Sequence, residues 1–197
     1  MDTRIFGTTA EEIEKAADVI RNGGLVAFPT ETVYGLGANA LDPDAVGKVY
    51  SAKGRPSDNP MIVHISSKDD VLKLTDRITE DMKKLMDAFW PGPLTMVVSA
   101  KTVIPKVTTG GLETVGIRMP SNPVAAELIS RSGVPIAAPS ANLSGKPSPT
   151  RFSHVVDDLD GRIDGIIAGE ECQAGIESTV VDMTDEIPVI LRPGVIT

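Results

Sequence analysis

The sequence lacks the cysteines for an internal disulfide bond and contains few aromatic side chains. Its 197 residues include a single cysteine, Cys172, so no internal disulfide can form, and this usage is typical of a reducing compartment. We interpret Cys172 as a small buried hydrophobic residue. Aromatic residues account for only 4% of the chain, whereas apolar residues account for 41%. This composition predicts α/β layers packed mainly through aliphatic side chains.

Long apolar runs and linkers are also missing. No stretch approaches the roughly 18 apolar residues of a membrane span, and residues 1–4 do not open an apolar signal region. We therefore expect a cytoplasmic protein with no membrane contact. No shift in composition divides the chain, so we expect one domain over residues 1–197.

Basic residues are outnumbered by acidic ones. The chain has 19 Lys and Arg against 27 Asp and Glu, which gives a formal net charge of -8. This charge opposes broad non-specific binding of nucleic acid, because such binding depends on basic surface. Any contact with RNA or phosphate must therefore be local.

Common nucleotide, hydrolase and zinc motifs are absent or weak. No lysine follows a Walker-type glycine loop, and no Gly-x-Ser-x-Gly elbow occurs. Residues 35–40 match the loose dinucleotide fingerprint, but the next helix is expected only from Asp42, so we interpret these glycines as a tight loop. His64, His154 and Cys172 lack the spacing of a familiar zinc site, and we expect no metal site built from side chains.

Hydrophobic periodicity and capping residues divide the chain into helices and strands. Helices are expected over residues 9–22, 67–74, 79–90, 122–129 and 154–159, with another from Asp42 to a loop that begins at Lys53. Strands are expected over residues 25–28, 61–65, 94–99, 114–119, 135–138, 163–168, 178–182 and 189–191. Predicted helices and strands alternate in the first part of the chain, but near the C-terminus three predicted strands follow one another without a helix between them. We therefore predict an α/β fold with a twisted, open, mixed β-sheet of about seven or eight strands and flanking helices.

Several predicted strands end in clusters of hydroxyl, amide and cationic residues, and open α/β sheets bind ligands beyond their strand ends. These clusters are residues 30–32, 53–55, 118, 140–142, 178–179 and 192. Lys53 and Arg55 share the loop with Gly54 and Pro56, so both can point at one anion, and this pairing suits a polyphosphate. Composition alone favours a solvated basic loop instead.

Arg118 and His64 each lie within an otherwise apolar predicted strand. A charge in a sheet core is costly unless it is paired. Arg118 therefore either meets a buried acid, such as Glu31 or Glu177, or faces a cavity that accepts a ligand carboxylate. A lone histidine such as His64 is more often a satisfied structural residue.

Five short stretches follow one another along nearly the whole chain. They are FPTETVYGL at residues 28–36, KGRP at 53–56, WPGPLT at 90–95, GIRMP at 116–120 and PSANLSG at 139–145. Together, and in this order, they resemble the YrdC-like family, the threonylcarbamoyl-AMP synthases. Each stretch is weakly specific by itself, whereas the set is highly specific. The Lys-x-Arg and Ser-x-Asn pairs are the part associated with synthase activity, here Lys53, Arg55, Ser140 and Asn142.

The resemblance implies a sheet curled around a deep central cavity that holds threonine and ATP side by side. The implied threonine-binding residues are Thr32, His64, Arg118, Ala138 and Ser178. The implied ATP-binding residues are Lys53, Arg55, Asn59, Thr114, Ser140, Asn142, Ser148 and Arg192. The implied catalytic residues are Lys53, Arg55, Ser140 and Asn142.

The implied reaction makes threonylcarbamoyl-AMP and pyrophosphate from L-threonine, bicarbonate and ATP. The threonine amine combines with bicarbonate to give a carbamate, whose oxygen attacks the α-phosphate, so no protein nucleophile is needed. Mg²⁺ is expected to arrive with ATP, held largely by phosphate oxygens and water. The implied downstream partner is a tRNA threonylcarbamoyl transferase complex, with a weak local contact to tRNA or double-stranded RNA. The chain ends soon after Arg192, so we expect it to lack the second domain that closes the cavity in longer members.

Three other interpretations stay open. One is a carbamoyl-adenylate activity of the hydrogenase-maturation kind, without threonine dependence. Another is a module that binds structured RNA through a concave positive face. The third is a relative without synthase activity, which the intact Lys-x-Arg and Ser-x-Asn pairs disfavour.

Overall fold

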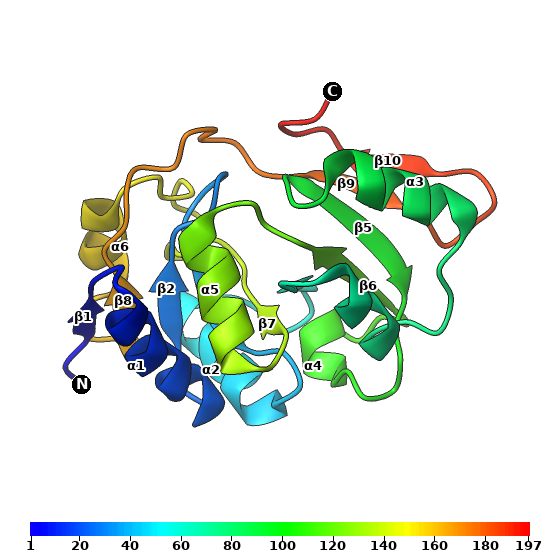
Figure 1. Ribbon diagram of the computed structural model, residues 1–197. Coiled ribbons are helices and arrows are strands. Elements are labelled where there is room, and N and C mark those ends of the chain that lie inside the picture. The colour runs from blue at the N-terminus through cyan, green and yellow to red at the C-terminus, as the bar shows by residue number, and fades with distance from the viewer.

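The computed structural model describes residues 1–197, and its strands form one ten-stranded sheet (Figure 1). The strands are β1 (Arg4–Phe6), β2 (Val26–Phe28), β3 (Gly35–Asn39), β4 (Ile62–His64), β5 (Leu94–Ser99), β6 (Thr114–Arg118), β7 (Ile136–Ala137), β8 (Gly165–Ile167), β9 (Thr179–Asp182) and β10 (Val189–Arg192). The helices are α1 (Ala10–Arg21), α2 (Pro43–Lys53), the 3₁₀ helix η1 (Lys68–Lys73), α3 (Glu80–Phe89), α4 (Lys106–Thr109), α5 (Pro123–Ser132) and α6 (Phe152–Leu159).

The sheet is open and mixed. Its strand order is β1-β8-β2-β3-β7-β4-β6-β5-β9-β10. Four neighbouring pairs are parallel, namely β1 with β8, β2 with β8, β4 with β6, and β5 with β9, and the other pairs are antiparallel. With helices flanking both faces, this arrangement confirms the predicted α/β class and its mixed sheet.

The predicted helix starts are confirmed by their caps. The Thr9 side chain accepts a hydrogen bond from the Glu12 amide at the start of α1. Asp42 and Asn122 cap α2 and α5 in the same way, each immediately before a proline at the first helical position.

Residues 35–39 form strand β3 and not the tight loop that the glycines suggested. A Cβ atom on Gly37 would lie 2.7 Å from Ile136 Cγ2 and 2.8 Å from Phe28 Cε1, so glycine is needed for close packing rather than for a turn. Glycine is depleted in strands, which explains the wrong prediction. The sequence also gave no indication of β1 or α4, and the sheet has ten strands instead of seven or eight.

Each face of the sheet has its own hydrophobic core, because successive side chains in a strand point to opposite faces. Helices α2, α3 and α6 contribute to the larger core, together with alternate residues of β4, β5 and β6. Helices α1 and α5 lie side by side and form the smaller core on the other face (Figure 1). The smaller core includes Val26, Phe28, Ile136 and Ile167 from the strands.

One row of registered residues leads from the smaller core across the sheet. It runs through Ile136 in β7, His64 in β4, Arg118 in β6, Thr95 in β5 and Val180 in β9. Registered neighbours point to the same face, so His64, Arg118 and Thr95 share the face that α1 and α5 cover elsewhere. None of the helices has the length and apolar character needed to cross a membrane.

Candidate active site

A cavity of about 250 Å³ lies beside His64 and Arg118, the polar residues of the registered row in β4 and β6. Its walls come from the segments between β2 and β3 and between α2 and β4, from β4 and β6, and from the segments after β7 and around β9 and β10. The cavity brings together eight of the thirteen predicted site residues, namely Thr32, Arg55, His64, Arg118, Ala138, Ser140, Ser178 and Arg192. The great depth that the resemblance implies stays a prediction.

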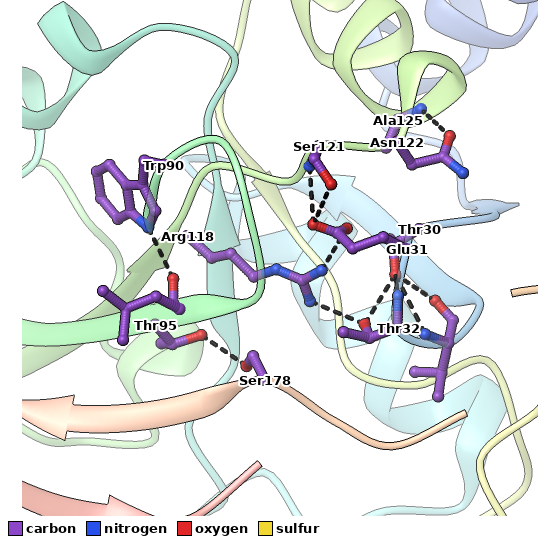
Figure 2. Close-up of polar contacts among 12 residues, drawn as sticks. Thr30, Glu31, Thr32, Trp90, Thr95, Arg118, Ser121, Asn122, Ala125 and Ser178 are labelled. Carbon is purple, nitrogen blue, oxygen red and sulfur yellow. Dashed lines mark hydrogen bonds and ion pairs between the residues drawn. The ribbon is translucent and has the colours of Figure 1, made fainter. Parts of the chain in front are cut away.

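Arg118 is the buried cation of the cavity. Its side chain is at the end of β6 and only 4% of the residue is exposed. Nη2 donates to Glu31 Oε1 at 2.5 Å, and Nη1 donates to Thr32 Oγ1 at 3.0 Å (Figure 2). Nε is buried without a hydrogen-bond partner. Arg118 therefore satisfies both alternatives left by the sequence, because it pairs with a partly buried acid and also lines a cavity.

Glu31 fixes the orientation of this guanidinium. Its second oxygen, Oε2, accepts hydrogen bonds from the Ser121 amide at 2.8 Å and the Ser121 hydroxyl at 2.9 Å. Burial opposes ionisation of Glu31, but the charge of Arg118 and the bonds from Ser121 outweigh it, so the pKa of Glu31 lies below its usual value. The pair is therefore charged at neutral pH.

His64 is a neutral neighbour of Arg118. Its Nδ1 lies 3.3 Å from the carbonyl oxygen of Ile136, and its ring meets Phe28 edge-on at 6.3 Å between centroids. Burial, followed by the nearby charge of Arg118, lowers the pKa of His64 to about 3. The ring therefore forms polar contacts in the cavity without adding a positive charge.

Hydroxyl groups surround the guanidinium. Thr30 Oγ1 lies 2.9 Å from Thr32 Oγ1 and donates to the Val33 carbonyl at 2.6 Å, which fixes the turn after β2. On the other side of Arg118, Thr95 Oγ1 and Ser178 Oγ are 2.8 Å apart (Figure 2). All these hydroxyls are buried, so they form an ordered set of donors and acceptors.

Lys53 does not lie in a loop, as the sequence suggested, but is the last residue of α2. Gly54 then ends the helix in the left-handed conformation, at φ 64°. The Lys53 side chain is buried, and Nζ donates to the carbonyl oxygens of Ser140 and Asn142. Burial, assisted by the charge of Arg55, lowers the pKa of Lys53 to about 8. Lys53 thus supports the 140–142 turn from behind the cavity wall.

Arg55 and Arg192 are the cavity's more accessible cations. Arg55 lies past the end of α2, over the Tyr50 ring, and donates to the Pro60 carbonyl at 3.2 Å. It forms no ion pair with an acidic side chain. Arg192 ends β10, where Nε and Nη2 donate to the Ser178 carbonyl at 3.1 and 2.9 Å, and Nη1 donates to Glu177.

Five predicted site residues lie outside the cavity lining: Lys53, Asn59, Thr114, Asn142 and Ser148. Thr114 is at the start of β6, at the opposite end from Arg118. Asn142 is buried, and Nδ2 donates to two carbonyls while Oδ1 has no partner. Ser148 reaches the cavity indirectly, because its hydroxyl donates to Glu177. The assignment of these residues to ATP stays a prediction.

The prediction missed Thr30 and Glu177 as lining residues. Thr30 belongs to the polar cluster at residues 30–32, after the first predicted strand, so this cluster could have identified it as a site residue. The sequence offers Glu177 only as one possible partner for Arg118, whereas in the structure it pairs with Arg192. Glu177 precedes β9 and Arg192 ends β10, so their pairing depends on the antiparallel contact between these two strands. Hydrophobic periodicity does not reveal that contact.

The residues around the cavity do not form a cage for a resident metal ion. No group of three His, Cys, Asp or Glu side chains converges anywhere in the chain. The acids nearest the cavity, Glu31 and Glu177, are each engaged with an arginine. A divalent ion that enters with a polyphosphate substrate would therefore take most of its oxygen ligands from phosphate and water.

The chain is similar to known proteins in both sequence and structure. A family profile for Sua5, YciO and YrdC, described as telomere recombination, matches residues 18–194. The chain is 58% identical over 194 residues to the threonylcarbamoyl-AMP synthase of Bacillus subtilis, covering 98% of this chain and 56% of that protein. It is 56% identical over 183 residues to the threonylcarbamoyl-AMP synthase of Pyrococcus abyssi, covering 93% of this chain and 54% of that protein.

A solved structure has nearly the same fold. The crystal structure of P. abyssi Sua5 complexed with L-threonine aligns with a TM-score of 0.96 and 54% identity, over 98% of this chain and 58% of that one. The chain thus spans just over half the length of the curated relatives it matches.

Proposed function

The chain belongs to the Sua5, YciO and YrdC family, and we propose that it forms threonylcarbamoyl-AMP and pyrophosphate from L-threonine, bicarbonate and ATP. The observation that carries this proposal is the cavity itself. It combines one fixed, buried arginine with two more accessible arginines and a set of hydroxyls, in a fold that aligns closely with a threonine-bound relative.

The buried part of the cavity suits the amino acid. Glu31 and Thr32 hold the Arg118 guanidinium in one orientation, and its Nε lacks a protein acceptor that a ligand carboxylate would provide. The hydroxyls of Thr32 and Ser178 offer partners for the substrate's hydroxyl and amine. Neutral His64 and Ala138 complete this part of the wall.

The more open part suits the nucleotide. Arg55 and Arg192 line the same cavity with their positive charges, and Ser140 lines it as well. We assign Lys53 and Asn142 to supporting roles, because Lys53 holds the carbonyls of Ser140 and Asn142 and neither side chain lines the cavity.

In this mechanism the protein orients reactants and neutralises charge. Threonine, fixed by Arg118, presents its amine to bicarbonate, and the two condense with loss of water to give the carbamate. A carbamate oxygen then attacks the α-phosphate as pyrophosphate leaves. Arg55 and Arg192 would offset the negative charge on the phosphates, and no side chain has to act as a nucleophile. Mg²⁺ belongs to the MgATP substrate in this scheme, and no step depends on a protein-bound ion.

The product would be used by a tRNA threonylcarbamoyl transferase complex in the cytoplasm, with at most a local contact between this chain and tRNA. This setting is part of the proposal and rests on the resemblance to the YrdC-like family. The net charge of -8 supports a local rather than an extended RNA contact.

Substrate omission tests the proposal. The purified chain is incubated with MgATP, bicarbonate and one amino acid, and pyrophosphate release is measured. Release should require both threonine and bicarbonate. Serine should react more weakly, because it lacks the methyl group that contributes about 1–3 kcal/mol when buried, and valine should fail because it leaves the buried hydroxyls unpaired. Release that is independent of threonine would reject the proposal.

A further inference from the structure

Glu177 occupies an unusual position for an acid in a cavity meant for polyphosphate. It lies in the segment between β8 and β9 and lines the cavity beside Arg192. Its Oε2 accepts from Arg192 Nη1 at 2.5 Å, and its Oε1 accepts from the Ser148 hydroxyl at 3.1 Å. One carboxylate therefore engages Arg192, which we propose as a ligand of ATP, and Ser148, which the family resemblance assigns to ATP.

We propose that Glu177 is an exchangeable internal anion, which holds Ser148 and Arg192 in the nucleotide-free protein and must release both before a polyphosphate can bind them. The inference rests on the proposed function, because it takes ATP as the ligand of this part of the cavity. It adds a residue that controls nucleotide affinity and that neither the motifs nor the polar clusters of the sequence indicate.

The geometry of Arg192 makes such an exchange feasible. Nε and Nη2 are bound to the Ser178 carbonyl, so the guanidinium stays in place when the carboxylate leaves. Only Nη1 is engaged by Glu177 and becomes free for a phosphate oxygen. The arginine is therefore already oriented, and the exchange changes one acceptor without rebuilding the wall.

The burial of the two arginine–carboxylate pairs distinguishes an exchangeable pair from a permanent one. The side chains of Arg192 and Glu177 are 40% and 39% exposed, and solvent-accessible pairs stabilise proteins only weakly. By contrast, the side chains of Arg118 and Glu31 are 5% and 18% exposed, and two bonds from Ser121 also hold Glu31. A polyphosphate can displace the first carboxylate but has no comparable access to the second.

Calorimetric titration without threonine or bicarbonate tests this exchange. Wild type, Glu177→Gln and Glu170→Gln are each titrated with MgATP and with inorganic tripolyphosphate. Glutamine keeps the shape of the side chain and one acceptor oxygen, but it replaces the other oxygen with an NH₂ donor and removes the competing charge. Glu170 is exposed in the same segment and forms no ion pair, so its variant has the same net charge as Glu177→Gln. Melting curves verify that all three proteins are folded.

Glu177→Gln should lower the dissociation constants of both ligands by about two- to fivefold, the range expected when a weak accessible ion pair no longer competes. Glu170→Gln should bind like wild type. Equal affinity for the two variants, or weaker binding by Glu177→Gln, would overturn the exchange. Wild type that binds neither ligand would overturn the proposed function as well, whereas measurable wild-type binding with no gain in Glu177→Gln would reject the exchange alone.

Discussion

The positive charges of two buried side chains near the cavity, Arg118 and Lys53, are stabilised by different kinds of neighbour. Arg118 is paired with the carboxylate of Glu31, whereas Lys53 is surrounded by neutral carbonyl oxygens of Ser140 and Asn142. An ion pair keeps both charges at neutral pH, but carbonyl dipoles only partly replace water around an ammonium. The two residues should therefore respond differently to substitution and to pH.

Substitution of Arg118 should separate ligand binding from folding. Arg118→Lys keeps a charge beside Glu31 but loses the planar fork, so threonine affinity should fall by about tenfold or more in a folded protein. Arg118→Met should lower the free energy of unfolding by up to about 3–5 kcal/mol, because the largely buried Glu31 loses its only partner of opposite charge and keeps only the hydrogen bonds from Ser121. Threonine calorimetry and urea melts measure these effects, with Arg131→Lys, at an exposed position of α5, as the control. Unchanged threonine affinity in folded Arg118→Lys would reject the carboxylate clamp.

Lys53 should give the protein a measurable dependence on alkaline pH. Its pKa is about 8 in the folded protein and near 10.5 when unfolded, so the unfolded chain binds more protons between these values. The free energy of unfolding should therefore rise with pH in this window relative to a Lys53→Met variant, by at most about 3 kcal/mol. Urea melts of both proteins from neutral pH to pH 10 measure the difference. Parallel pH profiles would show that Lys53 is not desolvated.

At the level of elements, the sequence predicts most helices and strands but not their neighbours. Capping residues locate α1, α2 and α5, and the apolar run at residues 94–99 coincides with β5. The row that joins His64, Arg118 and Thr95 depends on strand register, and local periodicity does not determine register between strands that are distant in sequence. The polar clusters therefore indicate which residues belong to the site. Which of these residues contact one another depends on the strand register, and only the structure shows it.

Strand β3 allows a direct test of the packing argument. Gly37→Ala should lower the free energy of unfolding by about 1–3 kcal/mol, because the new methyl group would overlap Ile136 and Phe28. The matched control is Gly47→Ala in α2, where an added Cβ meets nothing within 4 Å. This control should be neutral or stabilising by up to about 1 kcal/mol. If urea melts show the same effect for both variants, close packing around Gly37 is not what requires glycine.

At the scale of the whole molecule, the charge of the cavity and the net charge of the chain have opposite signs. The chain carries a net charge of -8, yet the cavity is lined by three arginines and a single acid, Glu177. A small cationic cavity on an acidic protein favours a compact polyanion such as ATP over an extended nucleic acid. This contrast supports the enzyme interpretation over a general RNA-binding module. The hydrogenase-type alternative does not depend on threonine, so the presence of threonine in the adenylate product distinguishes the two.

The most direct test of the central claim follows the bicarbonate carbon. The chain is incubated with MgATP, threonine and bicarbonate that carries a heavy carbon isotope, and the nucleotide products are analysed by mass spectrometry. We predict an adenylate that contains both threonine and the heavy carbon, formed together with pyrophosphate. An adenylate without the label, or pyrophosphate release with no threonine-containing adenylate, would contradict the account.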